Sequence, residues 1–152
     1  MPKTIRNKFD YYLTYEKLME AHMKSKKGKG YRKEIIEFNL KQEEYIMWLY
    51  TQLKNGTYKH GGYVEFYVTE PKLRKIEKSR YIDRIVHTWI AENFLLKYFA
   101  TQFIPTSYAC IRNKGMHRAA FCVQKYMKKA KQKWGEYYII KTDVAKYFNS
   151  IN

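Results

Sequence analysis

Acidic residues and cysteines are scarce in this chain of 152 residues, whereas lysines and arginines are abundant. The two cysteines, Cys110 and Cys122, stand twelve positions apart, a spacing that fits neither a zinc site nor a disulfide framework. The four histidines are scattered along the sequence and form no cluster of ligands. We therefore expect reduced thiols and no metal ion held by histidine or cysteine.

Long apolar runs are also missing. The N-terminus has no apolar signal segment, and no run approaches the roughly 20 residues that cross a membrane. A cytoplasmic protein without a membrane partner is the resulting expectation. Aromatic residues make up 18% of the chain, which argues against disorder, and a hydrophobic share of 45% allows a core.

Positive charge is concentrated in three blocks of a chain whose net charge is +16. Residues 24–33 contain six basic residues and no acidic one, and residues 71–84 contain six basic and two acidic residues. Residues 110–133 contain eight basic residues and no acidic one. Charge gathered in blocks is typical of a surface that binds a polyanion. Charge alone favours nucleic acid over a membrane surface and over a basic surface without a ligand.

Apolar spacing in the first half of the chain predicts helices followed by a hairpin. One helix is expected over residues 4–23. A second is expected to begin after Asn39, as its N-cap, and to end at Asn55. Residues 63–69 are rich in aromatic and β-branched side chains and predict a strand. Pro71 interrupts it, and residues 73–76 are expected to resume as the second strand of a hairpin.

The second half of the chain predicts two further helices and a last strand. A long helix with a wide apolar face is expected over residues 81–102, and a shorter one over residues 116–132. The inward positions predicted for the shorter helix are Ala120, Val123, Tyr126 and Met127. Residues 137–142 predict a buried strand that delivers Asp143 at its end. Together these elements predict an α+β fold.

Asp143 stands in a part of the chain that has few acids. From Asn93 onward, the only acidic residues are Glu136 and Asp143. A rigid strand that ends in a carboxylate is a common way to present an acid to a ligand. The same position also suits the N-cap of a following helix, and this feature alone favours the cap.

The segment around this aspartate, YIIKTDVAKYFNSI, resembles motif A of reverse transcriptases, particularly of the group II intron, retron and diversity-generating types. In that motif an apolar strand leads to an aspartate, and an aromatic residue follows five positions later, here Phe148. The resemblance implies that Asp143 binds two Mg²⁺ ions and that Val144 offers its backbone carbonyl to one of them. It also implies that Phe148 lies beneath the sugar of the incoming nucleotide and excludes a 2′-hydroxyl. An ordinary core aromatic is the alternative for Phe148.

Residues 71–87 resemble the fingers hairpin and the following helix of the same family. There, an arginine in the returning strand precedes an Asp-Arg pair by nine residues, as Arg74 does here. The resemblance implies that Arg74 grips the triphosphate of the incoming nucleotide. Lys72 is the preferred partner charge, ahead of Lys75. A solvated cationic hairpin without a fixed ligand is the alternative.

Asp83 and Arg84 form that Asp-Arg pair at the start of the expected long helix. We predict a structural role for Asp83, because its charge meets the positive end of the helix dipole. Arg84 is predicted to contact nucleic acid, with an acidic neighbour as the alternative.

Residues 103–120 resemble the segment that joins fingers to palm, in which an arginine and a glycine precede a helix rich in alanine. Arg112, Lys114 and Gly115 fall on these positions. The backbone amides at the helix start, together with Arg112 and Arg118, suit the phosphates of a template. The resemblance therefore implies a nucleic-acid-binding turn here.

The resemblance covers about residues 40–152 and implies part of a right-hand polymerase. It gives a helical N-terminal extension over residues 1–39 and a fingers region, with hairpin and helices, over residues 40–135. The palm, with its first strand, begins over residues 136–152. The implied activity is that of an RNA-directed DNA polymerase, a nucleotidyltransferase of retroelement type.

The implied partners are an RNA template, a DNA primer and deoxynucleoside triphosphates, and the implied cofactor is a pair of Mg²⁺ ions. The remaining catalytic carboxylates are expected beyond Asn152, so the isolated chain is expected to be inactive. A non-catalytic RNA-binding module with a fingers-like fold is the alternative function.

Overall fold

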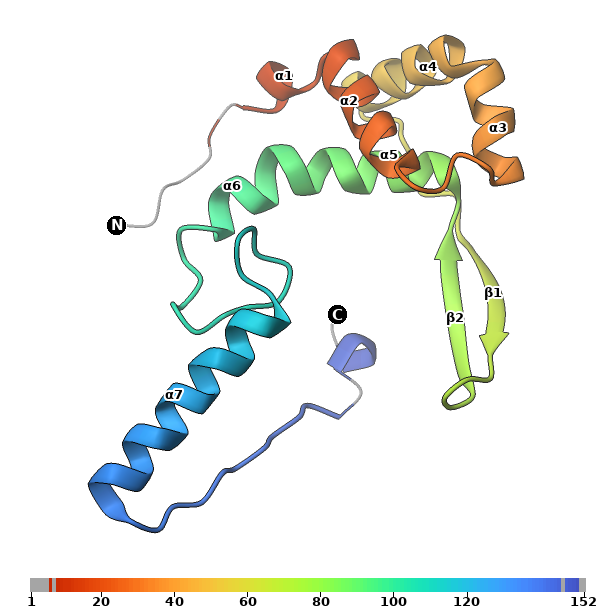
Figure 1. Cartoon of the computed structure of the whole chain (residues 1–152). Helices are drawn as coiled ribbons and strands as arrows, with labels where there is room; N and C mark the ends of the chain where they lie inside the picture. The colour runs from red at the N-terminus through yellow and green to blue at the C-terminus, as the bar shows by residue number, and fades with distance from the viewer. Residues whose placement is uncertain (1–5, 7, 146, 151–152) are drawn as a thin grey trace. The chain divides into compact units, whose positions relative to one another are not determined.

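The computed structural model describes residue 6, residues 8–145 and residues 147–150, leaving aside the side chains of Phe148 and Asn149. The described chain has an α+β fold, in which helices accompany one two-stranded antiparallel sheet (Figure 1). Within this described part, no helix is long and apolar enough to span a membrane.

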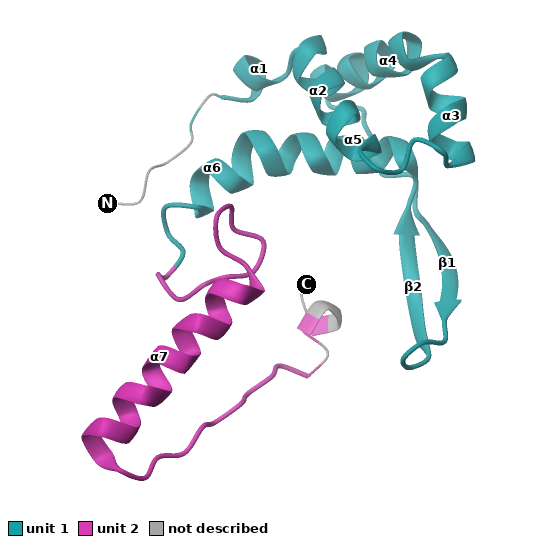
Figure 2. Cartoon of the chain, in the orientation of Figure 1, with its two compact units in different colours: residues 1–103 teal, residues 104–152 magenta. Residues whose placement is uncertain are grey.

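The chain divides into two compact units, residues 1–103 and residues 104–152 (Figure 2). This division follows packing contacts, so the boundaries expected after residues 39 and 135 stay predictions. Residues on both sides of residue 39 nevertheless contribute to one core.

The core of unit 1 is built by helices. Helix α2 (Tyr15–Lys26) packs against α4 (Gln42–Lys54) and α5 (Tyr81–Ile90), and α3 (Lys33–Leu40) packs on α4. Each helix turns apolar side chains toward the others, which removes them from water. The buried apolar residues are Leu13, Leu18, Ala21, Ile35, Phe38, Ile46, Leu49, Tyr81, Ile85, Val86 and Trp89.

The single helix expected over residues 4–23 is two helices. The short α1 spans Phe9–Tyr12, and α2 begins after Thr14. Thr14 has an extended backbone, and its Oγ1 accepts a hydrogen bond of 3.2 Å from the amide of Lys17. This N-cap gives a partner to a backbone amide that has none within the first turn of α2. The cap therefore explains why α2 starts anew after α1. The first residues of the expected helix lie outside the described part of the chain.

The expected N-cap at Asn39 is wrong, because Asn39 lies inside α3. Burial of Ile35 and Phe38 carries this helix on to Leu40. The break comes at Lys41, which precedes α4 and makes no side-chain cap. Packing of the apolar face has therefore outweighed the capping preference of asparagine.

The long helix expected over residues 81–102 is continuous from Tyr81 to Phe99, but a π-helical turn interrupts its α-helical geometry. Helix α5 is followed by the π turn η1 (Ala91–Leu95) and by α6 (Leu96–Phe99). At this turn the side-chain amide of Asn93 donates a 2.9 Å hydrogen bond to the carbonyl of Trp89. A side chain that enters the backbone ladder is a recognised cause of such local irregularity.

The expected hairpin is confirmed. Strand β1 (Tyr63–Val68) pairs with β2 (Arg74–Ser79) in antiparallel register, with Tyr63 opposite Ser79 and Val68 opposite Arg74. Every residue of β1 is exposed, and the hairpin extends away from the helices of unit 1 (Figure 1). The hairpin is therefore attached to its unit chiefly at its base.

Helix α7 (Met116–Trp134) forms where a helix was expected. The prediction that four of its residues face a core is wrong. None of its residues is buried. Val123, Tyr126 and Met127 instead line a shallow groove with residues 137–140. Within the described residues of unit 2, no larger core is present for them to enter.

The buried strand expected over residues 137–142 is also wrong for this chain. The segment carries no strand pairing, and Tyr138 and Ile140 are 94% and 85% exposed. A strand needs the hydrogen-bonding groups of a neighbouring strand, and the described residues of unit 2 contain none. After this segment the chain forms a 3₁₀ turn, η2 (Tyr147–Ser150).

His22 is a fully buried polar residue among the helices of unit 1. Its Nδ1 is hydrogen-bonded to the hydroxyl of Tyr81 at 2.9 Å, and its ring lies 4.9 Å from that of Phe38. Burial, followed by the charge of Lys26, lowers the pKa of His22 below its ordinary 6.5. Burial also raises the pKa of Tyr81 to about 12. The folded state therefore keeps both groups neutral.

Because the unfolded chain protonates His22 more readily than the folded chain does, stability should fall at acidic pH. The contribution of His22 is complete above its unfolded pKa of 6.5 and is lost as the pH falls below that value. Urea unfolding at pH 7 and pH 5 should show a smaller loss for His22→Gln than for the wild type. The exposed His117 provides the control, since His117→Gln should keep the full loss. Equal losses in all three proteins would contradict this role of His22.

Candidate functional site

Asp83 fixes the base of the hairpin. It lies in the first turn of α5 and is 1% exposed. Its carboxylate accepts hydrogen bonds from the hydroxyl of Tyr58 and, at 3.2 and 3.3 Å, from the amide of Gly61. Burial, followed by the bond to Asp83, raises the pKa of Tyr58. Asp83 lies in the first turn of α5, as its predicted role at the helix dipole requires, and its hydrogen bonds in addition tie the loop before β1 to α5.

Glu34 of α3 provides a second attachment. Its Oε1 accepts a 2.6 Å hydrogen bond from Nη2 of Arg84 and lies 2.8 Å from Nζ of Lys78. Burial alone would raise the pKa of Glu34, but the bonds from Lys78 and Arg84 outweigh it and lower the pKa. One carboxylate oxygen thus joins α3, β2 and α5.

Arg84 therefore has an acidic neighbour, the alternative to its predicted contact with nucleic acid. Its guanidinium also lies 5.2 Å from the ring centroid of Tyr81. Its Nε is buried and has no hydrogen-bond partner among the described residues. The nucleic-acid contact stays a prediction.

The far end of the hairpin carries the predicted nucleotide-binding residues. Lys72 lies in the turn, Arg74 begins β2, and both are exposed. Lys75 points to the opposite face from Arg74, where its Nζ lies 2.6 Å from Glu65 and 3.6 Å from Glu77. This geometry favours Lys72 over Lys75 as the partner charge. The residues that share a face with Arg74 are Val64, Phe66, Val68, Ile76 and Lys78.

The structure places the predicted nucleic-acid-binding residues of unit 2 in one turn at the start of α7. Lys114 donates a 2.7 Å hydrogen bond to the carbonyl of Pro105, and Arg118 donates one of 3.1 Å to the carbonyl of Asn113. Gly115 has a φ of +113°, which favours glycine at this position. The predicted residues in this turn are Arg112, Lys114, Gly115 and Arg118, of which Arg112 and Arg118 are exposed.

Asp143 and Val144 lie in the exposed extended segment that follows α7. In the parts of the chain that the structure describes, no group of three or more His, Cys, Asp or Glu residues could hold a metal ion. Asp143 offers one carboxylate, so these residues alone do not fit the two Mg²⁺ ions that the resemblance implies. The side chain of Phe148 lies outside the described residues, and its role stays a prediction.

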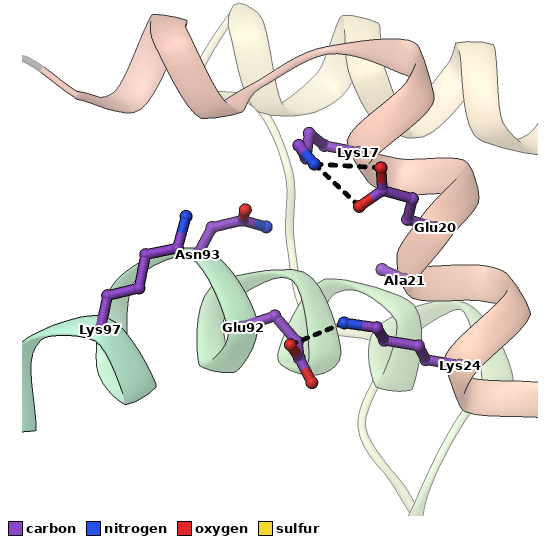
Figure 3. Close-up of a pocket in the computed structure, with 7 residues that line it drawn as sticks. All are labelled: Lys17, Glu20, Ala21, Lys24, Glu92, Asn93 and Lys97. Carbon is purple, nitrogen blue, oxygen red and sulfur yellow. Dashed lines mark hydrogen bonds and ion pairs between the residues drawn. The ribbon is translucent and has the colours of Figure 1, made fainter. Parts of the chain in front are cut away.

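A separate polar pocket lies between α2 and the π turn (Figure 3). Nζ of Lys17 lies 2.8 and 3.0 Å from the two carboxylate oxygens of Glu20, and Nζ of Lys24 lies 2.7 Å from Glu92. Lys97 lies over a tyrosine ring, 4.2 Å from its centroid. The lysines of this pocket thus already have partners within the chain. The cavity, of about 150 Å³, is lined by Lys17, Glu20, Ala21, Lys24, Glu92, Asn93 and Lys97.

Sequence spacing gave no indication of the residues that anchor the hairpin. Glu34 lies 50 positions before Arg84, and Tyr58 lies 25 positions before Asp83. No local periodicity connects residues so far apart.

No protein-family profile and no curated protein sequence matches this chain. The residues that bear on function are therefore those of the hairpin in unit 1 and those of the basic turn and Asp143 in unit 2.

Gly61→Ala should destabilise unit 1 by about 1–3 kcal/mol, because a methyl group there would force the side chains of Arg80 and Asp83 to shift. A Cβ at this position would lie 2.8 Å from Cδ of Arg80 and 3.1 Å from Oδ2 of Asp83. Gly30→Ala is the matched control, since its Cβ would meet open space, and it should stay within about 0.5 kcal/mol of the wild type. Urea unfolding checks both variants. Equal stabilities would contradict a tight closure of the loop on Asp83.

Proposed function

We propose that this chain is the fingers and early palm of a reverse transcriptase, which as a full-length protein copies RNA into DNA. The observation that carries the proposal is the anchored hairpin with its exposed cationic end. Arg74 and Lys72 are exposed there, while Asp83 and Glu34 bind the base to the helices. A rigid support with an exposed arginine suits the binding of a triphosphate.

Arg74 and Lys72 have complementary chemistry for this ligand. The planar guanidinium of Arg74 can donate to two phosphate oxygens at once, whereas Lys72 supplies a compact charge. In unit 2, the turn at Arg112 and Arg118 would bind phosphates of the template, helped by the backbone amides at the start of α7. The RNA template, the DNA primer and the nucleotide are thus the proposed partners.

Asp143 is the proposed catalytic residue of this chain. It is exposed, and the carbonyl of Val144 lies next to it in the sequence. Asp143 would be one of the carboxylates that hold Mg²⁺, and the chemistry supplied by the bound ions would be activation of a 3′-hydroxyl and neutralisation of phosphate charge. Asp143 would hold these ions together with further carboxylates, so this chain by itself should not incorporate nucleotides.

A non-catalytic RNA-binding module is the second candidate, and α7 favours it. The last part of this helix carries five lysines and no acid. Phe121 and Trp134 are 72% and 66% exposed, and Nζ of Lys133 lies 5.0 Å from the ring centroid of Trp134. Exposed rings among cations suit the stacking of unpaired bases.

Asp143→Ala in the full-length protein should abolish nucleotide incorporation and leave RNA affinity within about twofold. The variant removes a metal ligand but no cation, so phosphate contacts persist. Primer extension and RNA titration measure the two effects. Glu136→Gln, a neutralised acid in the same segment, is the control and should keep activity. Full activity of Asp143→Ala would reject the metal role and favour the non-catalytic module.

Arg74→Ala and Lys128→Gln should have different effects on the full-length enzyme. Arg74→Ala should raise the apparent KM for nucleotide about 10-fold or more, because a charge-assisted hydrogen bond contributes roughly 1.5–3 kcal/mol. Lys128→Gln should leave this KM unchanged and reduce the salt dependence of RNA binding by about one phosphate contact. Steady-state kinetics and titrations at several salt concentrations check the pair. Identical effects would reject separate sites for nucleotide and RNA.

A further inference from the structure

We propose that Glu34 is a positioning residue, whose carboxylate sets the orientation of the hairpin and so the place of Arg74. This inference rests on the proposed function of Arg74 as a ligand of the triphosphate. Glu34 itself lies at the base of the hairpin and is proposed to act only through Lys78 and Arg84.

The hairpin needs such a residue because packing does little to hold it. All of β1 is exposed, and in β2 only Ile76, Lys78 and Ser79 are half-buried. The two strands pack chiefly on each other. Their orientation relative to the helices therefore depends on contacts at the base.

Glu34 makes the contact that joins the three elements there. Its Oε1 lies 2.8 Å from Nζ of Lys78 on β2 and 2.6 Å from Nη2 of Arg84 on α5. The three side chains are only 22–33% exposed, so solvent screens this network less than an open surface pair. The neighbouring pair on α3, Lys33 and Glu37, has a distance of 3.8 Å and side chains that are 90% and 63% exposed. Glu34 therefore connects α3 to other elements through partly buried ion pairs, whereas Glu37 pairs, among the described residues, only with an exposed lysine of its own helix.

The contact of Glu34 with Lys78 and Arg84 matters for Arg74 because a small rotation at the base of the hairpin becomes a large displacement at its far end. Arg74 stands five residues before the end of β2, about 17 Å along the strand at roughly 3.4 Å per residue. A rotation of about 10° at the base would then move Arg74 by about 3 Å. Two-point binding of phosphate tolerates only about 0.5 Å and 10–20°. Loss of the contact at Glu34 should thus weaken binding at the far end of the hairpin.

The direction in which Glu34→Gln changes the affinity for an anionic ligand distinguishes a positioning role of Glu34 from a simple effect of its charge. Glu34→Gln removes a negative charge from a chain of net charge +16, which by itself should tighten the binding of an anion. Positioning predicts the opposite result, because the neutral amide oxygen of glutamine holds Lys78 and Arg84 more weakly than the carboxylate does. Glu37→Gln makes the same charge change on the same helix without touching the hairpin, and it is the matched control.

The test is titration of this chain with deoxythymidine triphosphate by calorimetry at fixed ionic strength. Glu34→Gln should weaken binding about 5- to 20-fold, whereas Glu37→Gln should leave it unchanged or slightly tighter. Thermal unfolding of each variant identifies any loss of folded protein. Binding by Glu34→Gln that equals or exceeds that of the wild type would overturn the proposal.

A second measurement examines the hairpin without any ligand. Residual dipolar couplings of the N–H groups of β1 and β2 should fit the alignment tensor of α2, α4 and α5 in the wild type. In Glu34→Gln the hairpin couplings should shrink, while those of the helices persist. Unchanged hairpin couplings would overturn the role of Glu34, even if the nucleotide binds. Failure of the wild-type chain to bind the nucleotide would instead reject the proposed function of Arg74.

Discussion

The buried carboxylate of Asp83 is the constraint on which the hairpin and its cationic end depend. An isolated charge in the interior is costly, and the donors that compensate it here are the hydroxyl of Tyr58 and the amide of Gly61. Both donors belong to the loop that leads into β1. As long as Asp83 is buried, this loop must stay closed on α5, and β1 must begin at a fixed place.

Ion pairs with acidic side chains determine which lysines and arginines of this chain remain available to a ligand. In unit 1, Glu34, Glu65 and Glu92 bind cations of their own unit. In unit 2 the block of residues 110–133 contains no acid at all, so no acid within the block neutralises the cations of α7 and of the turn before it. The scarcity of acids noted in the sequence thus has a structural consequence, a strongly cationic second unit suited to a polyanion.

Unit 2 also presents apolar groups that the described residues do not cover. Tyr138, Ile139 and Ile140 are exposed along an extended segment, although such residues are usual in a strand buried on both faces. The proposal of a palm strand accounts for them, since neighbouring strands would satisfy both the backbone and the side chains. Asp143 would then stand at the end of a supported strand rather than of an extended segment.

The sequence by itself determined the elements whose signals are local. The hairpin at residues 63–79 and the helix that begins at Met116 were predictable, because β-branched and aromatic composition and helical periodicity are properties of neighbouring residues. Tertiary structure alone decided that Asn39 lies within a helix and that Glu34 holds the hairpin. Those outcomes depend on burial and on partners about 50 residues away, whose contribution to the free energy no local pattern contains.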